Sequence, residues 1–144
     1  MLRILFVCTG NTCRSPMAEA ILKSKNRSGI DVKSAGVYAA NGIPASEHAQ
    51  KVLDEQKVDH SHRSSALTNG LVDWATHIFT MTEGHRDIVL SMFPQAKEKT
   101  FALKEFAGND VDVDIIDPFG GSLELYRRTY KEIYENIESI LNKI

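Results

Sequence analysis

The sequence predicts an α/β fold built on a parallel sheet that is covered by helices. Short apolar segments alternate with longer amphipathic ones, an order that favours right-handed strand–helix–strand crossovers. The first apolar segment, residues 2–7, is continuous apart from Arg3, as in a strand buried on both faces. A chain of 144 residues, 42% of them hydrophobic, suits one domain spanning residues 1–144.

The same patterns place the remaining elements in order. Further strands are expected at residues 30–37, 77–81 and 100–103. Helices are expected at residues 16 to about 27, 46–56, 68–74, 83–92 and 122–142. Ser46 and Thr82 suit helix N-caps, because a hydroxyl there can accept from an amide of the first turn.

Composition and charge exclude several classes of protein. A net charge of −2 gives no general attraction to nucleic acid or to a membrane surface. No segment is long and apolar enough for a membrane span, and because an apolar strand is predicted at residues 2–7 we expect no signal peptide. Two cysteines separated by four residues do not form a disulfide framework. We expect a monomer in a reducing cytoplasm.

The segment between the first strand and the first helix contains most of the candidate site. It reads Val7-Cys8-Thr9-Gly10-Asn11-Thr12-Cys13-Arg14-Ser15-Pro16, with Cys and Arg in a C-x5-R pattern. Ser15 is expected to cap the helix and Pro16 to be its first residue. Gly10 is expected to supply the unusual backbone dihedrals of a tight loop.

These residue types are suited to phosphate chemistry. A small polar loop can turn its amides inward and bind an anion, and the helix N-terminus behind it adds positive potential. Arg14 can bind two phosphate oxygens at once, and the same surroundings favour a Cys8 thiolate. The pattern predicts covalent phosphoryl transfer to Cys8. The alternative is a turn that binds no phosphate and holds two structural cysteines.

Asp117 is the candidate general acid. It lies with Pro118 in a loop, and it could protonate the leaving group and then activate water. The alternative is an Asp-Pro turn without a catalytic role. Three more acids precede it at spaced positions, Asp110, Asp112 and Asp114, but Ile115 replaces the Gly of a calcium loop. We therefore expect no metal site, and no cofactor.

Residues Cys8 to Ser15, followed by Pro16-Met17-Ala18-Glu19 and later by Asp117-Pro118, resemble the low-molecular-weight protein tyrosine phosphatase family. The resemblance covers essentially the whole chain. It implies a three-layer sandwich with a central four-stranded parallel sheet in the order 2-1-3-4, flanked by about five helices. It also implies that the phosphate is bound by Thr9, Gly10, Asn11, Thr12, Cys13, Arg14 and Ser15.

The resemblance implies roles for three more side chains. Ser34 would support the loop from the second strand, or else be an ordinary polar strand residue. His62 would hydrogen-bond the loop Asn, Asn11, or else lie on the surface. Cys13 could form a reversible disulfide with Cys8 that protects it from further oxidation, or else be a small buried packing residue.

Thr12 and Phe119 bear on the substrate. The tyrosine branch usually has an aliphatic residue in place of Thr12 and two aromatic residues after Asp-Pro, where this chain has Phe119-Gly120. The sequence is more similar to the bacterial protein-arginine phosphatase branch. A Thr hydroxyl suits a polar guanidinium, and Phe119 could stack on it. Arginine-phosphorylated proteins are the expected partners, and tyrosine-phosphorylated proteins are the alternative.

Two other classes fit the sequence less well. A thiol-linked arsenate reductase would need cysteines beyond Cys13, and a phosphate-binding module without catalysis would need neither Cys8 nor Asp117. His85-Arg86-Asp87 matches a kinase triplet, but no other kinase motif is present. We therefore expect that triplet to be a solvated helix face.

Overall fold

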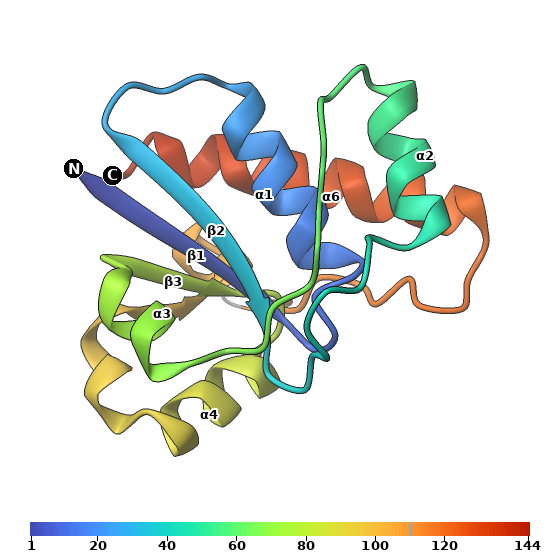
Figure 1. Cartoon of the computed structure of the whole chain (residues 1–144). Helices are drawn as coiled ribbons and strands as arrows, with labels where there is room; N and C mark the ends of the chain where they lie inside the picture. The colour runs from blue at the N-terminus through green and yellow to red at the C-terminus, as the bar shows by residue number, and fades with distance from the viewer. Residues whose placement is uncertain (110) are drawn as a thin grey trace.

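The computed structural model describes residues 1–109 and 111–144, so Asp110 of the spaced acids lies outside the described residues. Its centre is a four-stranded parallel sheet in the order β2-β1-β3-β4 (Figure 1). The strands are β1 (Leu2–Cys8), β2 (Ile30–Gly36), β3 (His77–Thr80) and β4 (Thr100–Ala102). The α/β class and the strand order expected from the sequence are confirmed.

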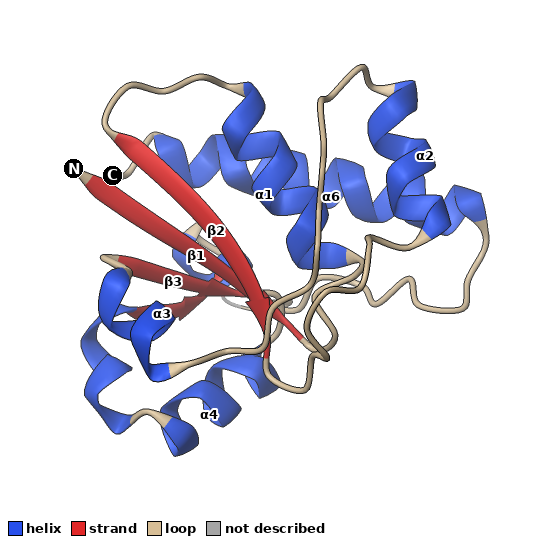
Figure 2. Cartoon of the chain, in the orientation of Figure 1, coloured by secondary structure: helices blue, strands red, loops and turns tan. Residues whose placement is uncertain are grey.

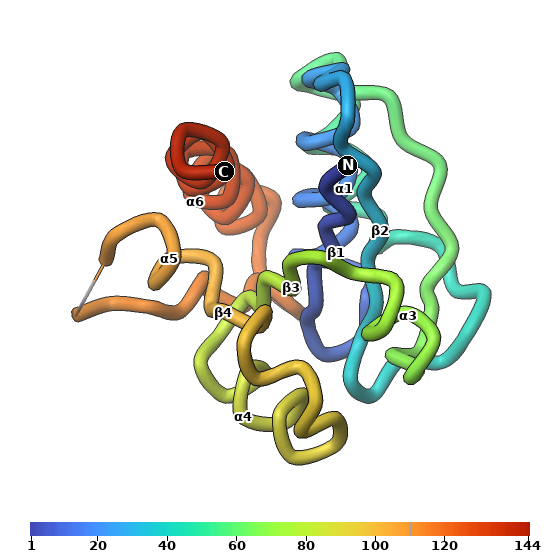
Figure 3. The backbone as a smooth tube through the Cα atoms, turned by 90° about the vertical axis from the view of Figure 1, so that its left-hand side faces the viewer, coloured from blue at the N-terminus to red at the C-terminus, as the bar shows by residue number. Residues whose placement is uncertain are grey.

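Helices cover both faces of the sheet, as Figures 2 and 3 show: α1 and α6 lie on one side with α2, and α3 and α4 lie on the other. Their bounds are α1 (Arg14–Ser24), α2 (Glu47–Glu55), α3 (Asn69–Trp74), α4 (Glu83–Met92) and α6 (Leu123–Leu141). The short helices η1 (Pro94–Lys99) and α5 (Leu103–Phe106), on either side of β4, are not predicted by the sequence. None of the helices in the described part of the chain could cross a membrane.

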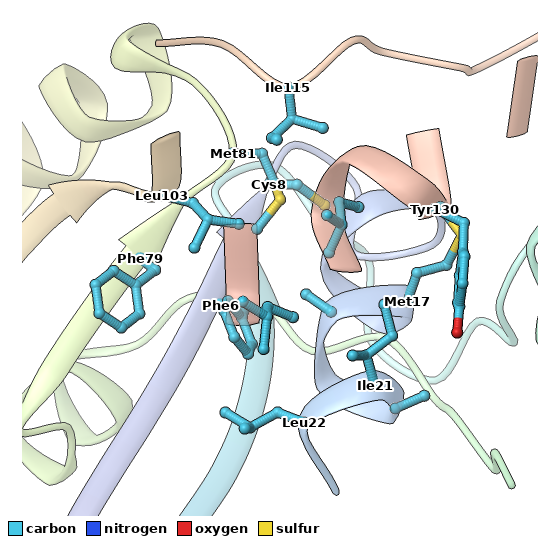
Figure 4. Close-up of a cluster of buried hydrophobic side chains, with 14 of the residues drawn as sticks. Phe6, Cys8, Met17, Ile21, Leu22, Phe79, Met81, Leu103, Ile115 and Tyr130 are labelled. Carbon is cyan, nitrogen blue, oxygen red and sulfur yellow. The ribbon is translucent and has the colours of Figure 1, made fainter. Parts of the chain in front are cut away.

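Alternate residues of β1 build two cores. Ile4 and Phe6 pack into the cluster beneath α1 and α6, whereas Leu5 and Val7 pack into the cluster beneath α3 and α4. This two-sided burial explains why β1 reads as a continuous apolar run. Cys8 ends the strand at the border of the first cluster (Figure 4). The buried Cys8 side chain therefore lies at the carboxyl end of β1, one of the two inner strands of the sheet.

The start of α1 differs from the expectation. The helix begins at Arg14 after Cys13, and no side chain caps it, so the prediction that Ser15 is the N-cap is wrong. Pro16 is the third helical residue instead of the first, which costs no hydrogen bond because the first four helix amides have no intrahelical acceptor. Ser15 lies inside the helix, and its hydroxyl is available to the loop.

Gly36, the last residue of β2, lies directly against the loop that follows β1. A Cβ atom at this position would be 2.4 Å from the carbonyl oxygen of Thr9 and 2.9 Å from the amide nitrogen of Asn11. Both neighbours are backbone atoms, which cannot move away as a flexible side chain can. Only glycine allows the loop to pack this closely on β2.

Replacing Gly36 with Ala should therefore destabilise the fold, by about 1–3 kcal/mol as is usual for overpacking. Urea unfolding measures this change in the free energy of unfolding. Gly70→Ala is the matched control, because a Cβ there meets only the Thr68 hydroxyl oxygen, at 3.8 Å. Equal free energies of unfolding for the two variants would contradict the close packing of the loop on β2.

Candidate active site

The loop after β1 points its carbonyl groups outward, into the surrounding protein. Four of these carbonyls accept hydrogen bonds: Cys8 from the amide of Val37 (3.0 Å), Thr9 from that of Tyr38 (3.0 Å), Thr12 from that of Ser46 (2.8 Å), and Asn11 from His62 Nε2 (2.6 Å). Within the part of the chain that the structure describes, the amides of residues 9–15 donate to no protein acceptor. The loop therefore has the character of an anion nest, with its carbonyls bound and its amides free.

Asn11 holds this loop conformation. It is fully buried and has a φ of 56°, in the left-handed region that Asn tolerates better than most residues. Its side-chain Nδ2 donates to Ser15 Oγ at 2.8 Å and to Ser34 Oγ at 2.9 Å, and its Oδ1 accepts from the backbone amide of Ser65 at 2.9 Å. The expectation that Gly10 supplies the unusual dihedral is wrong, because the left-handed residue of the loop is Asn11.

The Cys8 sulfur lies 2.8 Å from Ser15 Oγ, and Cys8 is buried. Because Ser15 Oγ already accepts from Asn11, its own proton is free to point at the sulfur. A hydroxyl donor and the N-terminal end of α1 both stabilise negative charge on sulfur. A directed chain of hydrogen bonds therefore runs from Asn11 through Ser15 to the Cys8 sulfur.

A second layer of side chains fixes Asn11 itself. Ser34 receives a hydrogen bond from Asn11 and donates to Glu19 Oε1 at 2.5 Å. His62, whose side chain is 9% exposed, binds the Asn11 carbonyl and has its Nδ1 3.9 Å from the same Glu19 oxygen. The contacts that the resemblance implied for Ser34 and His62 are present. Glu19, to which both connect, is a support residue that sequence reasoning missed.

Arg14 and Asp117 come together from opposite ends of the chain. Arg14 is 4% exposed, and its Nη1 donates to the carbonyl of Ile115 at 3.1 Å. Its Nη2 lies 3.7 Å from Asp117 Oδ2, while Asp117 Oδ1 accepts from the Phe119 amide at 3.0 Å. Asp117 therefore forms the Asp-Pro turn that was the alternative to a catalytic role, and its other carboxylate oxygen also faces Arg14. With its side chain 59% exposed, it can reach a bound substrate.

His85 approaches the loop from α4, and the prediction of a solvated helix face is wrong for this residue. It is buried, and its Nε2 lies 2.8 Å from the Thr9 hydroxyl oxygen. Burial, and to a lesser degree the charge of Arg14, lowers the pKa of His85 to about 4. His85 is therefore a neutral contact of the loop at physiological pH. The kinase-like triplet in which it lies gave no signal of this contact.

The remaining predicted residues surround the loop. Thr12 is half-buried, with its hydroxyl 3.9 Å from Cys13 Sγ, and Phe119 is 79% exposed beside Asp117. Cys13 is a free, buried thiol that lies 3.3 Å from the Tyr126 hydroxyl and 3.6 Å from Ser46 Oγ. The two interpretations of Cys13, protective partner and packing residue, both stay predictions.

A cysteine beneath free amides, a buried arginine and an exposed carboxylate on this fold define a cysteine-dependent phosphatase. A family model described as low molecular weight phosphotyrosine protein phosphatase matches residues 3–144. The chain belongs to this family.

Similar proteins extend over nearly the whole chain. The protein-arginine-phosphatase of Geobacillus stearothermophilus is 53% identical over 142 residues, which are 99% of this chain and 95% of the relative. The solved YwlE arginine phosphatase from the same organism is 52% identical, with a TM-score of 0.96 over 99% of this chain and 92% of that one. A YwlE arginine phosphatase mutant with a phosphorylated active-site serine is 41% identical, with a TM-score of 0.94 over 99% and 95%.

Asn11→Ala should slow phosphatase turnover by about 10- to 100-fold, because two or more hydrogen bonds that shape the loop are lost. Alkylation of Cys8 by iodoacetamide at neutral pH should slow as well, since Ser15 is no longer oriented toward the sulfur. Steady-state kinetics and alkylation rates measure both effects. Wild-type values of both quantities would show that the loop does not depend on Asn11.

His85 should make the fold sensitive to acid. An unfolded chain protonates histidine below about pH 6.5, whereas folded His85 stays neutral to about pH 4. Because the unfolded state then binds more protons, stability falls as the pH is lowered through this window. Urea unfolding at pH 7 and pH 4.5 should show a smaller loss for His85→Gln than for the wild type. Equal losses would contradict the depressed pKa of His85.

Proposed function

We propose that this protein is a protein-arginine phosphatase that works through a phosphocysteine intermediate. The observation that carries the proposal is the loop of free amides around the Cys8 sulfur, with Arg14 beside it. The similarity to arginine phosphatases over nearly the full chain supports the substrate class. The substrates would be arginine-phosphorylated proteins, in a reducing compartment such as the cytoplasm.

In the first step, the Cys8 thiolate attacks phosphorus in line with the scissile P–N bond. The loop amides and Arg14 bind the three equatorial oxygens while their charge redistributes. Asp117 donates its proton to the departing nitrogen, so that arginine leaves as a guanidinium. The phosphorylated active-site serine of a similar phosphatase mutant supports transfer of the phosphoryl group to this position of the loop.

In the second step, Asp117 is a carboxylate and accepts a proton from water as the water attacks the phosphocysteine. Phosphate is released, and both Cys8 and Asp117 return to their starting states. Asp117 is suited to both steps because its side chain is exposed and is attached through Oδ1 to its own turn. Asp117 Oδ2 lies 3.7 Å from Arg14 Nη2, and this attraction keeps that oxygen directed toward the loop around Cys8.

Thr12 and Phe119 favour phosphoarginine over phosphotyrosine. Thr12 presents a hydroxyl at the loop, which can hydrogen-bond a guanidinium but gives a phenyl ring little apolar contact. Phe119 is exposed next to Asp117, where an aromatic face can stack on a guanidinium. A tyrosine phosphatase is the alternative, in keeping with the name of the family model.

Parallel kinetics on phosphoarginine and phosphotyrosine peptides test the proposal. The specificity constant kcat/KM should be higher for phosphoarginine, and Cys8→Ser should abolish turnover of both peptides. Higher kcat/KM for phosphotyrosine would assign the protein to the tyrosine branch. Retained turnover by Cys8→Ser would contradict the phosphocysteine mechanism itself.

Thr12→Ile should shift the selectivity toward phosphotyrosine, because an aliphatic side chain packs against a phenyl ring. We expect the ratio of the two kcat/KM values to change by about tenfold or more, which corresponds to roughly 1.4 kcal/mol. Thr12→Ser, which keeps the hydroxyl, is the matched control and should leave the ratio close to that of the wild type. An unchanged ratio in Thr12→Ile would remove the specificity role of Thr12.

A further inference from the structure

Lys104 is a buried, positively charged residue that contacts Asp112 and Asp114, in the segment that leads to Asp117. It lies on α5, and its side chain is only 8% exposed. Its ammonium donates to Asp112 Oδ2 at 2.9 Å, to Glu132 Oε2 at 3.0 Å and to the carbonyl of Asp114 at 3.3 Å. An ammonium has three donors, so each of them has an acceptor here. We call Lys104, Asp112 and Glu132 the Lys104 cluster.

Glu132 connects this cluster to the residue before Asp117. It lies on α6, the 19-residue helix, and its Oε1 accepts from the backbone amide of Ile116 at 3.1 Å. One carboxylate therefore binds both the buried ammonium and the chain adjacent to Asp117. Burial alone would lower the pKa of Lys104, but the hydrogen bonds and the negative charges of Asp112 and Glu132 together raise it, so the lysine is charged at neutral pH.

The same short segment also contacts the phosphate loop, residues 8–15, and the residue that follows β3. The amide of Ile115 donates to the carbonyl of Met81 at 2.8 Å, and the Ile115 carbonyl accepts from Arg14 Nη1 at 3.1 Å. The Asp114 carboxylate accepts from the Glu83 amide at 2.8 Å. Residues 112–117 are thus held on one side by the Lys104 cluster and on the other by Arg14.

We propose that Lys104 and Glu132 are positioning residues that hold the backbone of residues 114–116 so that Asp117 can reach the leaving group. The inference rests on the proposed role of Asp117 as general acid. The hydrogen bonds of both side chains go to Asp112, Asp114 and Ile116 and to each other, so they would act on Asp117 through the backbone. Without Glu132 the buried ammonium keeps only Asp112 as a carboxylate partner, and without Lys104 the Glu132 carboxylate loses its ammonium, so in either case we expect the loop between them to shift. A displacement of about 1 Å at a reacting group can lower a rate by about 10²-fold.

A positioning role predicts a dependence on the leaving group. The quantity kcat/KM reports the steps up to phosphocysteine formation, in which Asp117 matters most when the leaving group needs a proton. p-Nitrophenolate leaves without much help, whereas phenolate and arginine do not. A general structural defect would instead lower kcat/KM for all of these substrates alike.

The test compares Lys104→Met and Glu132→Gln with the wild type on p-nitrophenyl phosphate, phenyl phosphate and a phosphoarginine peptide. We expect kcat/KM to fall by about tenfold or more for the last two substrates and by less than about threefold for the first. Inhibition by vanadate should be unchanged, because the phosphate loop is intact. Glu55→Gln is the control, since it breaks the ion pair between Glu55 of α2 and Arg127 of α6 without touching the loop.

Glu132→Gln preserves the shape of the side chain and removes only its charge. This variant therefore serves as the test if Lys104→Met does not fold. The decisive measurement adds each substitution to Asp117→Asn, where it should lower kcat/KM for phenyl phosphate no further. An additional loss of the same size as in the wild-type background would overturn the positioning role. So would normal activity of the single variants while Asp117→Asn alone is impaired. If Asp117→Asn alone has no effect, the acid assignment and this inference both fall.

Discussion

The hydrogen bonds of the Asn11 side chain are the constraint on which the candidate site depends. They fix a left-handed residue in the middle of the loop, and that dihedral directs the loop carbonyls outward to Tyr38, Ser46 and His62. The same side chain orients Ser15 toward the Cys8 sulfur. The free backbone amides and the contact of Ser15 with the Cys8 sulfur thus have one common cause, and both are present in the fold itself.

The site joins two parts of the molecule that are supported in different ways. The phosphate loop is held from β2 and α1, through Ser34, Glu19 and the close approach of Gly36. The Asp117 loop is held by backbone bonds and by charged side chains. Arg14, at the end of the phosphate loop, contacts the Asp117 loop through Ile115 and Asp117. A nucleophile needs a rigid anion site, whereas an acid that also activates water benefits from an exposed position on a loop.

The sequence predicted the α/β class, the strand positions and the residues of the loop, because these depend on local patterns. Apolar runs mark strands, and the Cys-to-Arg spacing marks the loop. Glu19 and His85 were missed because their contacts depend on distant partners, Ser34 and Thr9, which only the tertiary fold brings near. Ser15 was mistaken for a cap, because a hydroxyl at a helix start has the same local signal whether it binds the helix or a sulfur.

The most direct test of the account is a crystal structure of the protein with bound vanadate. We predict vanadium bonded to Cys8 Sγ, with its equatorial oxygens bound by the amides of residues 9–15 and by the guanidinium of Arg14, and with Asp117 beside the apical oxygen. Vanadate bound elsewhere, or a loop whose amides turn away from it, would contradict an anion site formed over Cys8 by the backbone amides of the loop.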